Sequence, residues 1–213
     1  MWRRWLLLPA LAALLLFLSG PCGAAVPREP IVFFMGASET AGYGLPSVAS
    51  AFPHLIAVRC GIVARVSATP NVPTVLRQPT NLAHVGGVVV VISFIDAYVP
   101  APRGAVRRWL GSFVSAAPTL IMTTPPIGEM GVDAPTLAEK QRRLYARINR
   151  DARANHAAHI SLALPAPPTR FLQRDGIHPN ALANRLIARR VEAWLRSKRL
   201  CPAAHSRKNR YGS

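Results

Sequence analysis

The sequence predicts a single three-layer α/β/α domain built on a parallel sheet of about five strands. Short apolar runs rich in β-branched residues recur along the chain, as expected of strands that are buried on both faces. Segments with helical spacing lie between these runs, and strands that alternate with helices are typical of parallel sheets. The chain has 213 residues, 50% of them hydrophobic, which is enough for the core of one such domain.

Five apolar runs are the candidate strands, in chain order 31–35, 55–58, 88–92, 119–122 and 160–164. The third run is the clearest, because it is an unbroken series of β-branched residues that follows two glycines. Prolines close the last two runs, as expected where strands end. These runs predict a flavodoxin-like order of alternating strands and helices.

The segments between the runs predict the helices. A turn from 36 to 46 leads into a weak helix, and residues 104–117 give a second, amphipathic one. Thr136 and Glu139 have the spacing of a capping box at the start of a third helix. Pro179 suits the first turn of a last helix, whose apolar face would hold Leu182, Leu186, Ile187, Val191 and Trp194.

The N-terminus has the parts of a secretory signal. Arg3 and Arg4 precede an apolar stretch from 6 to 18, and small residues follow up to Ala25. The stretch is shorter than the roughly 20 residues that span a membrane. We expect a signal peptide over 1–25 and a protein that is periplasmic or secreted, with an uncleaved membrane anchor as the alternative. The predicted domain then covers 26–199.

The net charge of +17 does not predict a nucleic-acid partner, because most of the surplus is arginine spread along the chain. The basic residues concentrate only at the C-terminus, where 200–213 reads as a disordered tail capable of weak contact with an anionic envelope surface. Cleavage would leave Cys60 and Cys201, and export permits a disulfide without indicating that these two pair. No cysteine or histidine spacing suits zinc, so no metal is expected.

Three polar residues are placed where a parallel sheet forms its sites, outside the carboxyl ends of the strands. Ser38 follows the first strand, and Asp175 and His178 lie on the loop before the last helix. A serine hydroxyl needs an adjacent base to act as a nucleophile, and that base needs a carboxylate to fix its tautomer. The three residues therefore predict a Ser-His-Asp triad.

These segments resemble the SGNH (GDSL-type) hydrolases over roughly 31–195. The most specific part of the resemblance is the Asp-Gly-Ile-His-Pro segment at 175–179, and Gly36-Ala37-Ser38 resembles the first family block. The resemblance implies that Ser38 is the nucleophile, that His178 is the base and then the acid, and that Asp175 orients His178. It also implies an oxyanion hole formed by the N–H of Ser38 and by that of Ala64, with Gly61 as the other candidate.

Two positions depart from the family pattern. Ala37 stands where the family has Asp, and the third block reads Ser93-Phe94-Ile95-Asp96 where the family has Gly-x-Asn-Asp. Isoleucine cannot donate a hydrogen bond, and loss of one oxyanion donor costs about 10²–10³ in rate. Ser93, Asn71 and Asn81 are possible substitutes, and no positional argument selects one. Asp96 is expected to tie down the loop after the third strand.

The sequence thus predicts an exported serine esterase that hydrolyses carboxylic esters without a cofactor. Its substrate would be an acyl ester of a small molecule, a lipid or an acetylated glycan, and removal of acetyl from a glycan is the favoured choice. The alternative is a catalytically degenerate SGNH-like domain that binds glycan or another envelope ligand. A third possibility is a basic adhesion protein that its tail holds at anionic surfaces.

Overall fold

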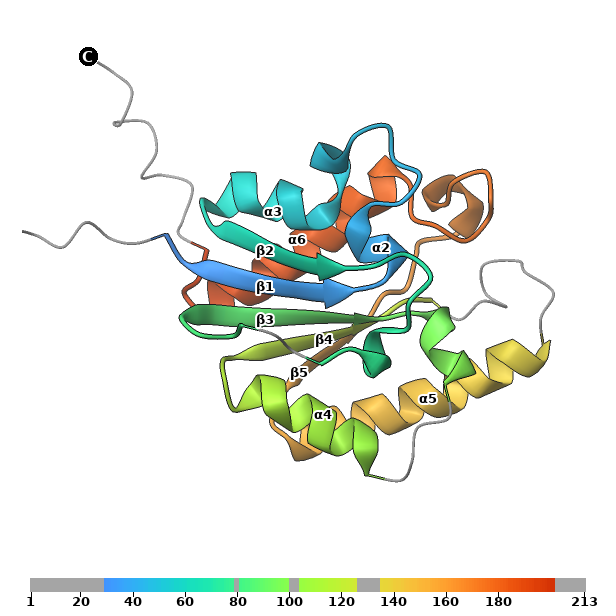
Figure 1. Cartoon of the computed structure of the whole chain (residues 1–213). Coiled ribbons are helices and arrows are strands. Elements are labelled where there is room, and N and C mark those ends of the chain that lie inside the picture. Colours follow the sequence, from blue (N-terminus) through green and yellow to red (C-terminus); the bar gives the residue numbers. More distant parts are fainter. Residues whose placement is uncertain (1–28, 79–80, 100–103, 126–134, 202–213) are drawn as a thin grey trace, which may run out of the picture.

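The computed structural model describes residues 29–78, 81–99, 104–125 and 135–201, and a parallel five-stranded sheet lies at its centre (Figure 1). The sheet order is β2-β1-β3-β4-β5, the flavodoxin-like arrangement. The strands are β1 (Ile31–Gly36), β2 (Val63–Ala68), β3 (Val85–Ile92), β4 (Thr119–Thr123) and β5 (Ala158–Ser161). This confirms the predicted fold class, a single α/β domain with an all-parallel sheet.

Helices cover both faces of the sheet, which gives the three predicted layers (Figure 1). On one face lie α3 (Phe52–Cys60) and α6 (Ala181–Ser197), and on the other lie α4 (Ala105–Val114) and α5 (Pro135–Ala154). Short elements occupy the loops: α2 (Ser38–Ala41), η1 (Val48–Ser50), η2 (Thr74–Leu76), η3 (Phe94–Tyr98) and η5 (Pro168–Phe171).

The central strand β3 shows why its apolar run predicted a buried strand. Val89 and Val91 pack into the core on the α3 and α6 side, whereas Val88 and Val90 pack into the core on the α4 and α5 side. All four side chains are buried. Only an apolar residue at every position satisfies both layers, because successive side chains point to opposite faces.

The predicted second strand is wrong, because residues 55–58 lie inside α3. Pro53 occupies the first turn of this helix, and Gly61 ends it with a left-handed φ of 61°. Val58 points outward and is 72% exposed. The second strand is instead β2, an edge strand without a fully buried residue, so its sequence has no continuous apolar run.

Three smaller corrections concern element ends. The fifth strand is Ala158–Ser161, earlier than the predicted run. At the start of α5, Thr136 lies inside the helix, and the carboxylate of Glu139 binds Arg142 and Arg143 rather than reaching back as a capping box. The last helix is capped by Asn180, whose side chain accepts the N–H groups of Leu182 and Ala183.

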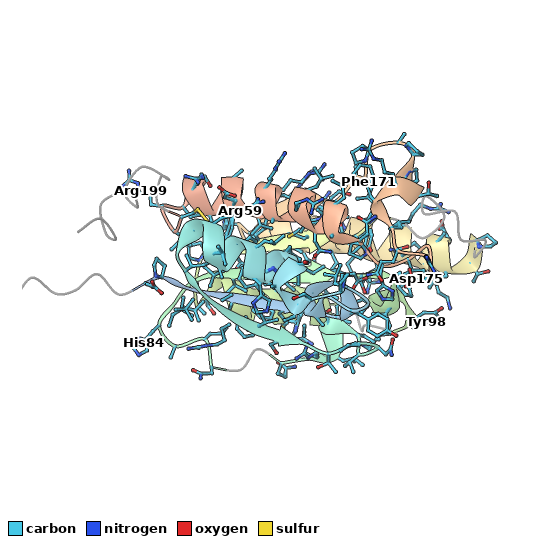
Figure 2. All side chains as sticks on the ribbon, turned by 90° about the horizontal axis from the view of Figure 1, so that it is seen from above. Arg59, His84, Tyr98, Phe171, Asp175 and Arg199 are labelled. Carbon is cyan, nitrogen blue, oxygen red and sulfur yellow. A yellow bond between two sulfur atoms is a disulfide. The ribbon has the colours of Figure 1, made fainter. Side chains whose placement is uncertain are left out.

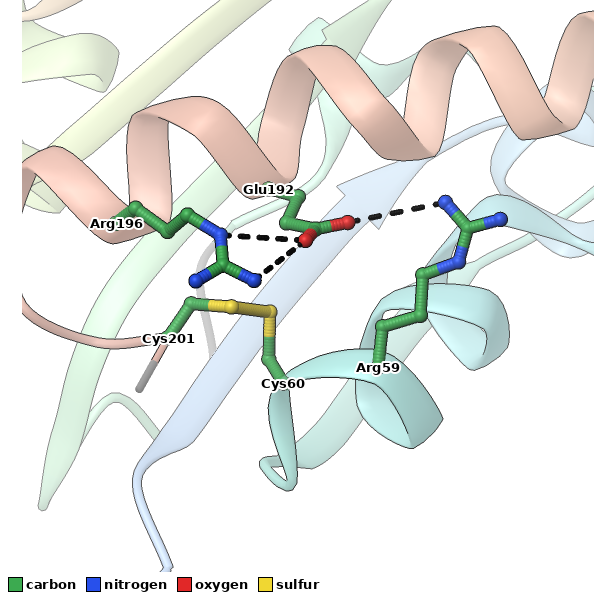
Figure 3. Close-up of a disulfide and its surroundings, with 5 residues drawn as sticks. All are labelled: Arg59, Cys60, Glu192, Arg196 and Cys201. Atoms are coloured by element: carbon green, nitrogen blue, oxygen red, sulfur yellow. Dashed lines mark hydrogen bonds and ion pairs between the residues drawn. A yellow bond between two sulfur atoms is a disulfide. The ribbon is translucent and has the colours of Figure 1, made fainter. Parts of the chain in front are cut away.

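A disulfide joins Cys60, the last residue of α3, to Cys201, which follows α6 (Figure 3). The sequence left this pairing open. The bond lies beside an ion-pair group in which Glu192 of α6 binds Arg59 of α3 at 3.7 Å and Arg196 at 2.8 Å. The two helices that cover one face of the sheet are therefore linked covalently and by charge.

The loop after β3 is held by Asp96, as the sequence predicted. Its two carboxyl oxygens accept the backbone N–H groups of Val75 at 2.8 Å and Ser93 at 2.9 Å. The side chain is fully buried, and burial raises the pKa of this carboxyl from 3.8 to about 7.

The structure leaves both predicted terminal segments largely untested. The signal peptide at 1–25 and all but two residues of the tail at 200–213 lie outside the described residues. Among the helices that are described, none has the length and apolar character needed to cross a membrane.

Removal of the disulfide in a Cys60→Ser, Cys201→Ser variant should lower the free energy of unfolding by about 4 kcal/mol, because a long closed loop restricts the unfolded chain. The bond spans a sequence separation of 141 residues. Urea unfolding of the variant and the wild type, each with and without dithiothreitol, measures this effect. An unfolding midpoint of the wild type that does not respond to dithiothreitol would contradict it.

Asp96→Asn should lower the free energy of unfolding by about 2 kcal/mol at pH 5, because its amide NH₂ would face a backbone N–H group. Since the folded pKa of Asp96 exceeds the unfolded value, wild-type stability should fall as the pH rises from 3.8 to about 7. The variant should lose that part of the slope. Urea unfolding across this pH range measures both effects, and Asp151→Asn on α5 is the control for one lost acid.

Candidate active site

The structure brings the three predicted triad residues into one hydrogen-bonded chain. Oγ of Ser38 lies 2.9 Å from Nε2 of His178, and Nδ1 of His178 lies 2.6 Å from Oδ2 of Asp175. Ser38 and His178 are 140 residues apart in the sequence, so this contact exists only in the folded protein. Ser38 is 7% exposed, and the side chain of His178 is 14% exposed.

Ser38 is positioned by a tight connection between β1 and α2. Gly36 ends the strand, and a Cβ at this position would collide with the side chain of Thr40. The absence of that atom lets α2 start directly on the strand, with Ala37 O accepting the N–H groups of Thr40 and Ala41. The nucleophile candidate is therefore the first residue of a helix that leaves the carboxyl end of β1.

Arg77 binds the end of β1 through its side chain, and no sequence pattern predicted this role. Its guanidinium donates to the carbonyl of Gly36 at 2.9 Å and to the carbonyl of Ser67 at 2.7 Å, which ties β1 to β2. The indole N–H of Trp109 donates to the carbonyl of Arg77. The chain has 26 lysine and arginine residues, and nothing in the sequence distinguishes Arg77, which lies in a loop, from the others.

The loop that carries His178 is organised by Asp175. Oδ1 of Asp175 accepts the backbone N–H groups of Ile177 at 2.9 Å and His178 at 3.0 Å, while Oδ2 contacts the ring. Gly176 between them has a φ of 70°, a left-handed conformation that favours glycine. The three-residue spacing of Asp175 and His178 is therefore that of a turn that brings the carboxylate against the imidazole ring.

The loop is also fixed at its base and points to the same edge as Ser38. Gln173 N–H donates to His178 O at 2.8 Å, and its side chain donates to the carbonyls of Tyr43 and Pro179. Figure 2 shows Asp175 at the same end of the molecule as Tyr98, which ends η3, and far from His84, which precedes β3. This end is the carboxyl edge of the sheet.

The electrostatics of the loop suit a base that accepts a proton from serine. Burial acts to raise the pKa of Asp175, but hydrogen bonds from the N–H groups of His178 and Ile177 and from the His178 ring outweigh it, so this pKa lies below its ordinary value. An ionised carboxylate can only accept, so Nδ1 of His178 carries the proton. Nε2 is then free to accept the hydroxyl proton of Ser38.

The predicted oxyanion residues other than Ser38 do not lie at the triad. Gly61 ends α3, and Ala64 pairs with Val32 near the start of the strands. Ala64 is four residues before Ala68, the partner of Gly36, so it is about 13 Å from the carboxyl edge at the usual rise per residue. The prediction was wrong because it placed the second strand at 55–58. Ala64 was therefore expected in the turn after that strand, whereas it lies near the start of β2.

The three residues that the sequence analysis offered as substitutes for the family's Asn lie at different edges of the sheet. Ser93 follows β3 and Asn71 follows β2, so both lie at the carboxyl edge, as does Ile95 in η3. Asn81 precedes β3 and accepts from Arg65 through its carbonyl, which places it at the opposite edge. The structure therefore removes Asn81 from the set and leaves the other two.

Glu39 is a further acidic residue at the site, and sequence reasoning missed it. Its side chain is 5% exposed, and its Oε2 lies 3.4 Å from Oγ of Ser38. Burial raises the pKa of this carboxyl, although its own backbone N–H and the charge of His178 act in the opposite direction. The available signal was an acid directly after the predicted nucleophile in a chain with only nine acids.

A small apolar cavity of about 30 Å³ adjoins the triad. Glu39 forms part of its wall, together with Ile177 and Pro179, the two neighbours of His178 in the chain. Nearly all other wall residues are apolar or proline: Phe52, Val91, Met122, Thr124, Pro125, Leu162, Leu164, Leu172 and Ile187. Within the described ranges, no group of three His, Cys, Asp or Glu side chains could hold a metal ion.

Comparison with solved structures finds the same fold at low sequence identity. A GDSL-like lipase from Bacteroides ovatus matches with a TM-score of 0.60 and 14% identity, over 82% of this chain and 55% of that chain. A lipolytic protein of the G-D-S-L family from Desulfitobacterium hafniense gives 0.58 and 13%, over 80% and 98%. A family two carbohydrate esterase from Clostridium thermocellum in complex with cellohexaose gives 0.56 and 15%, over 81% and 65%.

No family model and no curated protein sequence matches this chain. The chain spans about half the length of the Bacteroides lipase that it matches. The similarity therefore concerns the arrangement of strands and helices, which is shared at 13–15% identity. On that evidence, the chain has the fold of the SGNH, or GDSL-type, hydrolases.

Proposed function

We propose that this protein is a serine esterase that hydrolyses carboxylic esters. The observation that carries this proposal is the hydrogen-bonded chain from Ser38 through His178 to Asp175, with separations of 2.9 and 2.6 Å. Those separations lie within the reach that a nucleophile and its base require. The fold supports it further, because the neighbours in the structural comparison include lipases and esterases.

In this mechanism Ser38 attacks the ester carbonyl while His178 takes its proton at Nε2. Asp175 keeps the other ring nitrogen protonated and stabilises the charged ring. His178 then returns the proton to the departing alcohol, which leaves an acyl group on Ser38. Water, activated by the same ring, hydrolyses this acyl enzyme and restores the hydroxyl. No cofactor takes part.

The oxyanion hole of this mechanism starts from the backbone N–H of Ser38. Ala64 and Gly61 are withdrawn from it because they lie at the other end of the strands. We propose that the side chain of Ser93 or of Asn71, which both lie at this edge, supplies a second donor. One missing donor lowers the rate by about 10²–10³ and leaves the remaining catalysis in place.

The substrate class proposed is a small acyl ester, with an acetylated glycan as the favoured example. Two neighbours support a glycan: the Clostridium esterase bound to cellohexaose, and a two-domain esterase active on acetylated mannans, co-crystallised with mannopentaose. Tyr43 supports it on this chain, because this residue is 53% exposed and its ring centroid lies 4.9 Å from that of His178. An exposed aromatic ring beside the base is a surface on which a sugar can stack.

Export is part of the proposal. The predicted leader at 1–25 and the disulfide between Cys60 and Cys201 both suit a protein that acts outside the cytoplasm, where disulfides persist. A weak contact of the basic tail with an anionic envelope surface remains part of the same proposal.

A binding domain without turnover is the second candidate, and Ile95 is the observation that favours it. The resemblance implies a donor amide at this position, and the chain has isoleucine there, in η3 after β3. A solved neighbour in this fold is described as a carbohydrate esterase whose active site displays divergent catalytic and non-catalytic binding functions.

A fluorophosphonate probe should label the wild type, whereas Ser38→Ala and His178→Ala should be unlabelled. The probe reacts only with a serine whose proton has a nearby acceptor. Mass spectrometry of the labelled peptide, with Ser112→Ala on α4 as the matched serine control, identifies the site. A folded wild type that stays unlabelled, yet binds acetylated oligosaccharide, would favour the binding domain.

Asp175→Asn should lower kcat for p-nitrophenyl acetate by about 10⁴, because the amide would donate to Nδ1 and force the proton of His178 onto Nε2. KM should change little, since Asp175 is not expected to touch the substrate. Asp151→Asn, which removes an acid from α5, is the control and should retain activity. Equal kcat values for the two variants would rule out the role proposed for Asp175.

A further inference from the structure

Glu39 has an unusual setting for a carboxyl group. It is 5% exposed, and the wall it shares is otherwise almost entirely apolar. Burial makes the charged form of this carboxyl costly and raises the pKa of Glu39, in spite of the opposing charge of His178. The mechanism proposed above does not use this group.

The position of Glu39 relates the cavity to the reacting atoms. One carboxyl oxygen is 3.4 Å from Oγ of Ser38, while the same side chain forms part of the cavity wall. Neither Ser38 nor His178 lines the cavity, although the residue after Ser38 and both neighbours of His178 do. Three wall residues are thus direct chain neighbours of triad residues, and among them Glu39 contacts Oγ of Ser38.

We propose that Glu39 determines acyl-chain specificity by closing the apolar cavity to the acyl group that is bound at Ser38. This inference rests on the proposed esterase function and deepens it. With Glu39 in place, the acyl group has room for little more than acetyl beside Oγ. Without it, the chain of a longer acyl group can continue from Oγ into the cavity between Leu164, Leu172 and Ile177.

The size and chemistry of the cavity agree with this role. Its volume of about 30 Å³ holds roughly two water-sized groups, so it can take a few methylenes once the carboxyl is removed. Apolar walls favour an alkyl chain over water, and each buried methylene should raise binding roughly fourfold. The buried acid is therefore what keeps an otherwise suitable alkyl site from the nucleophile.

The test is the ratio of kcat/KM for p-nitrophenyl hexanoate to that for p-nitrophenyl acetate. Glu39→Ala should raise this ratio at least tenfold, because it joins the cavity to the site. Glu39→Gln keeps the size of the side chain and should leave the ratio within twofold of wild type. The ratio cancels any common change in the reactivity of Ser38, which either substitution could cause through the 3.4 Å contact.

A second variant separates closure by Glu39 from simple cavity size. Leu164→Ala enlarges the cavity and keeps Glu39 in place, so it should leave the ratio unchanged. Combined with Glu39→Ala, it should extend the preference to octanoate. A rise with Leu164→Ala alone would overturn the proposal, since the wild-type cavity would then already be open to the acyl group.

The proposed function and this inference fail differently. If the folded wild type is neither labelled by the fluorophosphonate nor able to hydrolyse the acetate ester, the esterase proposal is refuted. If Glu39→Ala is active but its hexanoate-to-acetate ratio is unchanged, only the role of Glu39 is refuted. Hexan-1-ol gives a readout without turnover: it should raise the melting temperature of Glu39→Ala and not that of wild type or Leu164→Ala. Equal shifts in all three proteins would also overturn the inference.

Discussion

The parallel pairing of β1 with β3 at the centre of the sheet is the constraint on which the candidate site depends. This pairing sets the ends of the two strands side by side, with Met35 opposite Val90, so that α2 and η3 leave the sheet together. The apolar residues of β3 enforce it, because they fill the cores on both faces. The nucleophile candidate is therefore held by strands whose side chains are almost all buried.

The candidate base, His178, is held by other means, since no strand leads directly into its loop. Asp175 closes the loop through two backbone N–H groups and the ring of His178. Gln173 then joins this loop to Tyr43, in the segment after α2. One carboxylate thus shapes the loop and contacts the ring of His178, so the local turn and the proposed chemistry have the same origin. The disulfide acts at the far end of α6, where it fixes the helix that follows the loop.

Sequence periodicity predicted the buried elements and failed where burial is partial. β3 and β4 are buried at almost every position, so their apolar runs were unambiguous. β2 is an edge strand with half-exposed residues, and the apolar run in α3 took its place in the prediction. Periodicity over four residues cannot distinguish a strand from a helical turn, and flanking Pro53 and Gly61 are the features that mark the helix.

The sequence by itself determined the fold class and the three residues of the proposed triad, because the strand runs and the Asp-x-x-His turn are local patterns. Only the tertiary structure decided which groups surround them. The pairing of Cys60 with Cys201, the clamp formed by Arg77 and the burial of Glu39 each depend on segments that are distant in sequence or packed from another layer. The oxyanion donors follow the same rule, since a backbone N–H is identical in every residue and only strand register places it.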